Sequence, residues 1–407
     1  MNGVCILGCT GSIGRNTLEV LALHPERYRV VSLAARSDVD GMLAQCLQWR
    51  PARAALSDAA AARELMLRLK SAGCATEVLA GADAIPQLAR DPDADIVMAA
   101  ISGAAGLRSA LAAAGAGKRI LIANKESVVM AGTLLLQTAR RSGATLIPVD
   151  SEHNAIFQCL PAPWQVGERP AGVRRLLLTA SGGPFLDWSL QDMQLATPAQ
   201  AIAHPRWSMG AKISVDSATL MNKGLELIEA AVLFGVPPAD IDILIHPESV
   251  VHSLVEFVDG SVLAQLGAPD MRTPISQALA WPVRLHAGVQ FLDLVTARQL
   301  NFRAPDEARF PALRLARQAA CSGGDAPVWL NAADEVAVQA FLDKRLNFGD
   351  IPAVIAAVMD RYGTGQLSQS GDLDAVLQAD ARARAEAGKL LASGRIHGLP
   401  FSSRVAS

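Results

Sequence analysis

Short apolar runs alternate with amphipathic segments along the first 150 residues of the chain. The runs that predict buried strands occupy residues 4–7, 28–35, 54–56, 96–100, 119–123 and 146–149. Segments with a helical spacing of apolar residues separate them, for example 16–21 and 61–70. Buried strands that alternate with helices are typical of a parallel sheet with helices on both faces. We therefore predict an α/β fold that begins with a doubly wound, Rossmann-like parallel sheet in residues 1–149.

The pattern changes after residue 150. We expect strands at 173–180, 241–246 and 250–266, and the last of these turns back at Asp259-Gly260, which is a type I′ hairpin signal. Together with a helix that runs on through residue 231, these strands predict a central α+β domain in residues 150–280. Residues 281–306 predict a linker. Helical patterns then follow at 311–321, 327–342, 350–361 and 371–393 and predict a C-terminal helix bundle in residues 307–407.

Two adjacent acids, Asp334 and Glu335, stand out in the predicted bundle. Because acidic residues are favoured in the first turn of a helix, we interpret them as part of a helix N-terminus and not as a site. Residues 398–407 are expected to be mobile.

Composition narrows the class of protein. With 407 residues the chain predicts two or three domains, and a formal charge of -2 gives no electrostatic footprint for nucleic acid. No apolar run is long enough to cross a bilayer, and the N-terminus passes directly into a strand without a signal or transit pattern. The six cysteines are scattered and form no C-x-x-C pair, which indicates buried thiols in a reducing compartment. We therefore expect a cytoplasmic protein.

A glycine-rich turn, Gly8-Cys9-Thr10-Gly11-Ser12-Ile13-Gly14, stands between the first strand and the first helix. Glycines at such a turn let the backbone approach a dinucleotide pyrophosphate, and the helix N-terminus favours its negative charge. The spacing is G-x-x-G-x-x-G, so a tight turn in another α/β fold remains an alternative.

The second strand ends in Arg36-Ser37, where an NAD enzyme usually has an acid. An arginine and a serine suit a 2′-phosphate and therefore predict NADP. Asp38 is equally compatible with the following turn.

Further polar residues follow later strands of the same sheet. Ligands of such sheets bind at the carboxyl ends of the strands, so Ser102-Gly103 and Asn124-Lys125-Glu126 are expected on the cofactor side. A charged first turn of helix is the alternative for Lys125 and Glu126.

The last strand of this domain ends in Asp150-Ser151-Glu152-His153. In an extended strand Asp150 and Glu152 point the same way, and the sequence offers no local lysine or arginine to neutralise them. Oxygen ligands favour Mg²⁺ or Mn²⁺, so we predict a divalent metal site. A helix N-cap formed by Asp150 or Ser151 is the alternative.

Three segments in the middle of the chain suit an anionic ligand. Ser181-Gly182-Gly183 follows a strand and exposes backbone N–H groups, as an anion nest does, although it equally fits a plain turn. Residues 203–212 place a tryptophan and a methionine between proline and glycine, which indicates a loop that closes over a ligand or an ordinary loop with a buried tryptophan.

The third segment is a helix in which Asn222, Lys223 and Glu226 share one face. Glu226 is a candidate third metal ligand, and Ser217, Asn222 and Lys223 are candidate phosphate contacts; a solvated helix face is the alternative. His246 and His252 receive no role.

Seven motifs carry a resemblance to a known family: GCTGSIG, ANKES, PVDSEHNAIFQ, ASGGPF, HPRWSMG, KISVDSATLMNKGLE and LGAPDMRTPI. In this order the chain resembles the 1-deoxy-D-xylulose 5-phosphate reductoisomerases, which are NADPH- and metal-dependent enzymes of the non-mevalonate isoprenoid pathway. The resemblance covers essentially the whole chain. It implies a homodimer, an NADPH-binding first domain and a catalytic central domain.

The resemblance also implies residue roles. Metal ligands would be Asp150, Glu152 and Glu226. Substrate contacts would be Ser151, Ser181, His204, Ser217, Asn222 and Lys223, together with the metal ligands Glu152 and Glu226. NADPH contacts would be Thr10, Gly11, Ser12, Ile13, Asn124, Glu126, Met209 and Gly210, in addition to Arg36, Ser37 and Lys125. Lys125 would lie near the reacting oxygens, His153 would border the active site, and Trp207 would lie on the closing flap.

The implied reaction breaks and remakes a carbon–carbon bond of the sugar phosphate and then reduces the branched aldehyde with NADPH. One departure from the family pattern is Arg36, which stands where a glycine is common, so the contacts to the 2′-phosphate are expected to be rearranged. Glu248 replaces a commoner glutamine and receives no role.

Two other classes of function remain open from the residues. A simple NADP-dependent dehydrogenase for a phosphorylated sugar or semialdehyde would keep its activity after chelation or in the Glu226→Gln variant. A non-catalytic NADP-sensing protein would bind NADPH without turnover.

Overall fold

The computed structural model describes residues 1–161, 164–205, 207, 209–362 and 372–394. Within it the chain forms two compact units, each built from separate stretches of sequence. The first unit contains Met1–Val128, Thr133–Val166 and Gln265–Asp293, and the second contains Val129–Gly132, Gly167–Ala264 and the chain from Leu294 onward. The sequence analysis divides the chain into consecutive domains instead, and those boundaries stay predictions.

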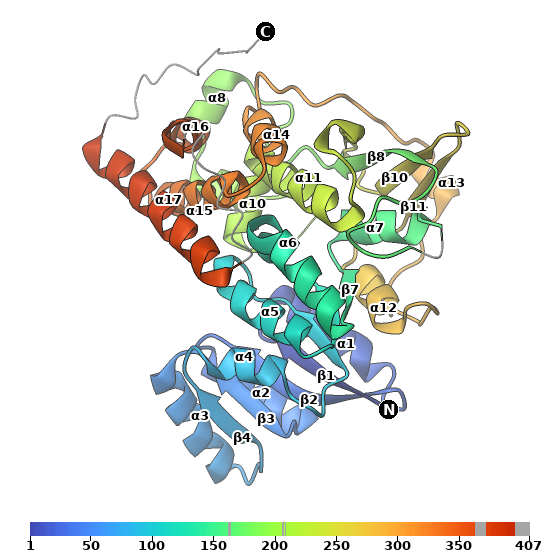
Figure 1. Cartoon of the computed structure of the whole chain (residues 1–407), viewed down its shortest axis with the longest axis vertical. Coiled ribbons are helices and arrows are strands. Elements are labelled where there is room, and N and C mark those ends of the chain that lie inside the picture. Colours follow the sequence, from blue (N-terminus) through green and yellow to red (C-terminus); the bar gives the residue numbers. More distant parts are fainter. Residues whose placement is uncertain (162–163, 206, 208, 363–371, 395–407) are drawn as a thin grey trace. The chain divides into compact units, whose positions relative to one another are not determined.

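The first unit is organised around a seven-stranded sheet with the order β4-β3-β2-β1-β5-β6-β7 (Figure 1). Its strands are β1 (Asn2–Leu7), β2 (Tyr28–Ala35), β3 (Arg53–Leu56), β4 (Glu77–Ala80), β5 (Ile96–Ala99), β6 (Arg119–Ile122) and β7 (Thr145–Pro148). Every neighbouring pair is parallel. The strand order reverses between β1 and β5, so their carboxyl ends form the switch point at which such sheets bind ligands. The predicted doubly wound parallel sheet is confirmed.

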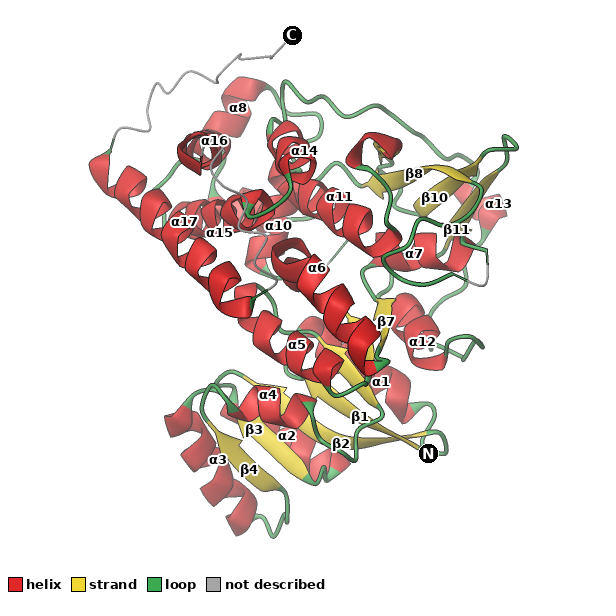
Figure 2. Ribbon diagram, viewed as in Figure 1, coloured by secondary structure: helices red, strands yellow, loops and turns green. Residues whose placement is uncertain are grey.

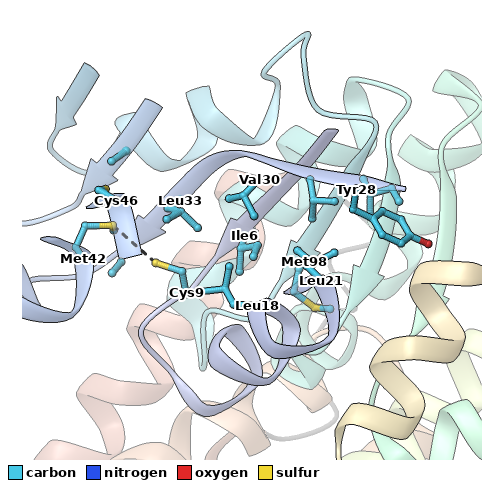
Figure 3. Packing of buried hydrophobic residues seen from close by; sticks show 14 of the residues in the cluster. Ile6, Cys9, Leu18, Leu21, Tyr28, Val30, Leu33, Met42, Cys46 and Met98 are labelled. Carbon is cyan, nitrogen blue, oxygen red and sulfur yellow. Dashed lines mark hydrogen bonds between the residues drawn. The ribbon is translucent and has the colours of Figure 1, made fainter. Parts of the chain in front are cut away.

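Helices cover both faces of this sheet, as α2 and α4 do in Figure 2. The helices of the unit are α1 (Ser12–Ala22), α2 (Val39–Trp49), α3 (Ala59–Ser71), α4 (Ala84–Ala89), η1 (Ala104–Gly106), α5 (Leu107–Gly115), α6 (Lys125–Ser142), α7 (Ser151–Cys159) and α12 (Arg272–Ala280). The core consists of fully buried strand residues such as Ile6, Leu33 and Met98 (Figure 3). Cys9 of the glycine-rich turn joins it, with its Sγ 3.8 Å from the Sδ of Met42. Because this apolar packing continues into the turn, the turn is held on a rigid base.

The edge strand β4 is absent from the sequence-based prediction. It has only four residues, with exposed or half-buried side chains, so it shows none of the continuous apolar character of the inner strands.

The second unit contains a four-stranded mixed sheet with the order β11-β10-β8-β9. Its strands are β8 (Val173–Ala180), β9 (Ile241–Ile245), β10 (Val251–Phe257) and β11 (Val262–Leu266). β10 runs antiparallel to β8, and β9 runs parallel to it. The predicted hairpin is confirmed, but its turn type is wrong. Type I′ needs a positive φ at two successive residues, whereas only Gly260 has one, at 88°, and the Asp259 side chain accepts hydrogen bonds from Ser261.

Helices make up the rest of the second unit. They are α8 (Leu190–Gln194), α9 (Pro198–Ile202), α10 (Ala211–Thr219), α11 (Met221–Phe234), η2 (Pro238–Asp240), α13 (Leu294–Ala297), α14 (Ala312–Ser322), α15 (Ala326–Leu342), η3 (Phe348–Asp350), α16 (Ile351–Tyr362) and α17 (Leu373–Ser393). The predicted C-terminal helices are thus confirmed. Asp334 and Glu335, however, lie in the middle of α15, so their interpretation as a helix N-terminus is wrong. Residues 398–407, predicted to be mobile, lie outside the described residues. Within those that are described, no helix is long and apolar enough to span a membrane.

Candidate active site

The glycine-rich turn joins β1 to α1 at the switch point of the parallel sheet. Gly8 has a φ of 90°, and a Cβ there would lie 2.5 Å from the carbonyl oxygen of Ala100, which follows β5. A Cβ on Gly14 would lie 2.4 Å from the Gly8 oxygen. Helix α1 then begins at Ser12 with Gly11 as its N-cap and no side-chain cap. Thr10, Gly11, Ser12 and Ile13 therefore surround a helix N-terminus that suits an anionic phosphate.

Arg36 and Ser37 are exposed directly after β2. The loop that carries them is fixed at its backbone, because the N–H of Asp58 donates to the Arg36 carbonyl at 2.9 Å. Asp38 caps α2 by accepting from the N–H of Gly41. Asp38 therefore belongs to the helix cap, which leaves Arg36 and Ser37 as the polar side chains at this strand end.

Asn124 ties together two loops at the carboxyl edge of the sheet. Its side chain caps α6 by accepting from the N–H of Ser127 at 2.6 Å and donates to the carbonyl of Gly103 at 2.9 Å. Lys125 and Glu126 follow in the first turn of α6, and Glu126 is buried. This first turn is therefore packed into the strand edge and is not a solvated helix start.

Asp150 also lies at a helix start and not on a strand. β7 ends at Pro148, Asp150 is the N-cap of α7, and Ser151 and Glu152 form the first turn. The strand-alternation argument for Asp150 and Glu152 is thus wrong in its geometry. The N-cap alternative gives the position correctly, but the Asp150 side chain makes no cap hydrogen bond.

A lysine neutralises Asp150, although none is near it in the sequence. The Nζ of Lys125 lies 2.9 Å from Asp150 Oδ2, and the Nδ1 of the fully buried His153 lies 3.9 Å from the same oxygen. The two residues meet because they follow the adjacent parallel strands β6 and β7. Ser151 Oγ donates to Glu152 at 2.6 Å. The first unit therefore gathers two carboxylates, a cation and an imidazole at one end of α7.

In the second unit, α11 places Asn222, Lys223 and Glu226 on one face, as predicted. Asn222 Nδ2 donates to Glu226 Oε1 at 2.5 Å, and Lys223 Nζ donates to Glu226 Oε2. Lys223 and Glu226 are only 3% and 1% exposed. The solvated-face alternative is therefore wrong, since a buried carboxylate needs such a cationic partner or a metal ion.

His204 and Ser181 form a second polar cluster in this unit. The Nδ1 of His204 accepts from the N–H of Trp207 at 2.9 Å, so Nε2 carries the proton that is donated to Ser181 Oγ at 2.9 Å. Burial lowers the pKa of His204 to about 4, which keeps the ring neutral at physiological pH. Ser181 Oγ also accepts from the N–H of Gly183, so its own O–H is directed to a further acceptor such as a phosphate oxygen.

Ser217 lies against the same turn. Gly182 and Gly183 have φ values of 89° and 72°, and a Cβ on Gly183 would lie 2.5 Å from the Ser217 carbonyl oxygen. Trp207 and Met209 are half-buried, while Gly210 is exposed and precedes α10. Arg206 and Ser208 of the predicted closing loop lie outside the described residues, and its motion stays a prediction.

Comparison with known proteins identifies the family. A family model described as 1-deoxy-D-xylulose 5-phosphate reductoisomerase matches residues 4–132, and two models of its C-terminal domains match residues 146–234 and 266–386. The chain belongs to this family. A relative of that name from Methylococcus capsulatus is 56% identical over 97% of this chain and 100% of its own. One from Pseudomonas fluorescens is 55% identical over 94% and 96%.

Solved structures of the family agree with the fold. A DOX-P reductoisomerase in complex with NADPH, fosmidomycin and magnesium has a TM-score of 0.93 and 48% identity, covering 96% of this chain and 98% of its own. The Zymomonas mobilis enzyme in complex with NADPH has a TM-score of 0.87 and 46% identity, with the same coverage. The chain is therefore a reductoisomerase of this family and neither a simple dehydrogenase nor a non-catalytic sensor.

Proposed function

We propose that this protein converts 1-deoxy-D-xylulose 5-phosphate to 2-C-methyl-D-erythritol 4-phosphate by rearrangement and NADPH-dependent reduction, with Mg²⁺ or Mn²⁺. The observation that carries the proposal is the family match along nearly the whole chain. The cofactor turn and the acidic start of α7, both at carboxyl ends of strands in one sheet, support it. In this proposal residues 1–149 bind NADPH, residues 150–280 hold metal and substrate, 281–306 link, and 307–407 form the helical domain.

The donor set fits a hard divalent ion. Asp150, Glu152 and Glu226 are the proposed ligands, as the family resemblance implies, and all supply carboxylate oxygens. When bound, the ion would supply Lewis acidity at the substrate oxygens, and NADPH would supply a hydride. Lys125, whose ammonium lies 2.9 Å from Asp150, would pair with that carboxylate and orient it, and the buried His153 would limit its movement.

Hydroxyl, amide and ammonium groups would bind the substrate. Ser151 would contact the substrate backbone. The neutral His204 would hold the Ser181 hydroxyl so that the serine proton points to the phosphate. The remaining proposed contacts to substrate and phosphate are Ser217, Asn222 and Lys223. Binding the phosphate at a distance from the reacting carbons would hold the reacting fragments in place while the bond is remade.

The proposed NADPH contacts lie along the sheet edge and in the closing loop. They are Thr10, Gly11, Ser12, Ile13, Arg36, Ser37, Asn124, Lys125, Glu126, Met209 and Gly210. Support comes from the close approach at Gly8, which fits a pyrophosphate over α1, and from Asn124, which holds the neighbouring loops in place.

The test follows NADPH absorbance with 1-deoxy-D-xylulose 5-phosphate in the presence of Mg²⁺ or Mn²⁺, and then with excess EDTA. We expect oxidation only when both the substrate and the metal are present, with recovery after the metal is restored. Oxidation that persists in EDTA would contradict the metal-dependent mechanism.

Arg36 is expected to set the preference for NADPH over NADH. The exposed Arg36 follows β2 directly, where it can contact the 2′-phosphate. Because a paired arginine–phosphate contact stabilises binding by about 1.5–3 kcal/mol, Arg36→Ala should raise the NADPH Kd about tenfold or more. The NADH Kd should stay unchanged, since NADH has no 2′-phosphate. Fluorescence titration of both cofactors measures this. Arg29→Ala, which removes an exposed arginine at the amino end of the same strand, is the matched control. Equal losses for NADPH and NADH would show that Arg36 does not contact the 2′-phosphate.

We further propose a homodimer in the cytoplasm. The dimer is supported by the edge position of β11, where Val262 and Leu263 are 47% and 50% exposed, and by Val258 in the preceding turn, which is 75% exposed. An exposed apolar sheet edge is a template for pairing with another chain. Light scattering after gel filtration tests the dimer, and a monomer at micromolar concentration would contradict it.

The cytoplasmic location is supported by the buried thiols Cys5, Cys9 and Cys46, which fit a reducing compartment. Cell fractionation would check it.

A further inference from the structure

Asp334 is a fully buried carboxylate for which the proposed reaction has no use. It lies in the middle of α15 and is 0% exposed, between Ala333 and Glu335. Its neighbours on the buried side of the helix include Ala337 and Val338, which are apolar and also fully buried. Since burying a charge in such surroundings is costly, the carboxylate requires a specific partner.

That partner comes from α10, which lies beside α15 in the second unit (Figure 1). Lys212 Nζ lies 3.1 Å from Asp334 Oδ2 and 2.6 Å from Asp216 Oδ2. Lys212 and Asp216 are one turn apart on α10, and Asp216 is 1% exposed. Burial raises the pKa of the Asp334 carboxyl, and the neighbouring Lys212 ammonium opposes this rise. One ammonium thus joins two buried carboxylates of different helices.

α10 connects two parts of the proposed substrate site. It begins at Ala211, directly after Met209 and Gly210 of the closing loop. Its last turn carries Ser217, whose carbonyl oxygen packs against Gly183 of the Ser181–Gly183 turn. A displacement of this short helix would therefore move the base of the loop and the phosphate contact together.

A buried ion pair rarely stabilises a protein more than apolar residues of the same volume would, but removing one partner is costly because the other charge is left buried. In some proteins such a pair also selects one arrangement of the packed elements. Apolar packing between α10 and α15 would allow the helices to slide, whereas the lysine fixes the position of α10 along α15.

We propose that Asp334 is a positioning residue that holds α10 through Lys212 and thereby sets the closing loop and Ser217 for substrate binding. The proposal rests on the substrate roles proposed above for Ser181, Ser217 and the loop. It assigns to the C-terminal helices a part in substrate affinity, although Asp334 contacts no substrate.

The test compares Asp334→Leu, Asp334→Asn and Glu335→Gln in the full-length enzyme. Asparagine keeps an acceptor for Lys212, so it should retain most of the wild-type behaviour. Glu335→Gln is the matched control, because Glu335 pairs with Arg384 of α17 at 2.5 Å and not with α10. We expect Asp334→Leu to raise the substrate KM about tenfold while kcat stays within about twofold. Amide hydrogen exchange should increase in residues 211–219.

Each outcome decides the proposal. An unchanged KM and unchanged exchange in Asp334→Leu would overturn it, and so would equal changes in Glu335→Gln, which would indicate general weakening of the bundle. If Asp334→Leu does not fold, Lys212→Gln tests the same contact from α10 and should give the same rise in KM. Absence of turnover in the wild type would refute the proposed function but not the role of Asp334. Amide hydrogen exchange in residues 211–219 would still report on the Asp334–Lys212 contact.

Discussion

Asp150→Asn is expected to lower kcat about a thousandfold. Asparagine is as good an N-cap as aspartate, so α7 should remain folded. The substitution removes the charge that Lys125 contacts at 2.9 Å and one of the three proposed metal ligands. If the ion contributes about 4 kcal/mol of transition-state stabilisation, loss of its coordination corresponds to about three orders of magnitude in rate. Steady-state NADPH oxidation over a range of Mg²⁺ or Mn²⁺ concentrations measures the effect.

The matched control is Asp372→Asn, which makes the same change at the N-cap of α17. It should leave kcat unchanged. The NADPH Kd of Asp150→Asn should also stay near the wild-type value, because the glycine-rich turn at Gly8–Gly14 is separate from α7 in the sheet edge. A kcat reduced by less than about tenfold would mean that Asp150 does not bind the metal.

The fold was largely predictable from the sequence because its buried strands are strongly patterned. The inner strands β1, β5 and β6 are continuous apolar runs, and the C-terminal helices show clear periodicity. The edge strand β4 was missed because half of its surface faces solvent, which erases the pattern. The turn at Gly260 was assigned the wrong type, because Asp-Gly also fits turns in which only the glycine is left-handed.

The candidate site was predictable by residue type more than by geometry. Asp150 and Glu152 were singled out as carboxylates at a strand end, yet they occupy a helix start. The Lys125–Asp150 contact depends on the pairing of β6 with β7, which no local pattern specifies. Asp334 was interpreted as part of an acidic helix N-terminus, whereas it lies in the middle of α15. Its contact with Lys212 depends on how α15 packs against α10.

Lys223→Met is expected to raise the substrate KM about a hundredfold. Lys223 is 3% exposed, and its ammonium donates to Glu226. In the proposed site a substrate phosphate would accept from the same ammonium, either beside Glu226 or in its place. A charged hydrogen bond to phosphate contributes about 1.5–3 kcal/mol, and each 1.4 kcal/mol corresponds to about tenfold. Substrate KM, kcat and the metal concentration for half-maximal activity are measured together.

The three quantities separate two roles for Lys223. If Lys223 binds the phosphate, the substrate KM rises in Lys223→Met. The metal concentration for half-maximal activity stays constant or falls, because the lysine that competed with the ion for Glu226 is gone. If the lysine acts only by keeping Glu226 ionised and in place, the metal requirement rises and the substrate KM changes little. Lys118→Met is the matched control for the loss of a structural ammonium, because Lys118 donates to the backbone carbonyls of Asp91 and Ala94. It should change none of the three quantities. Retention of both wild-type values in Lys223→Met would place Lys223 outside the substrate site and leave Ser181 and Ser217 as the candidate phosphate ligands.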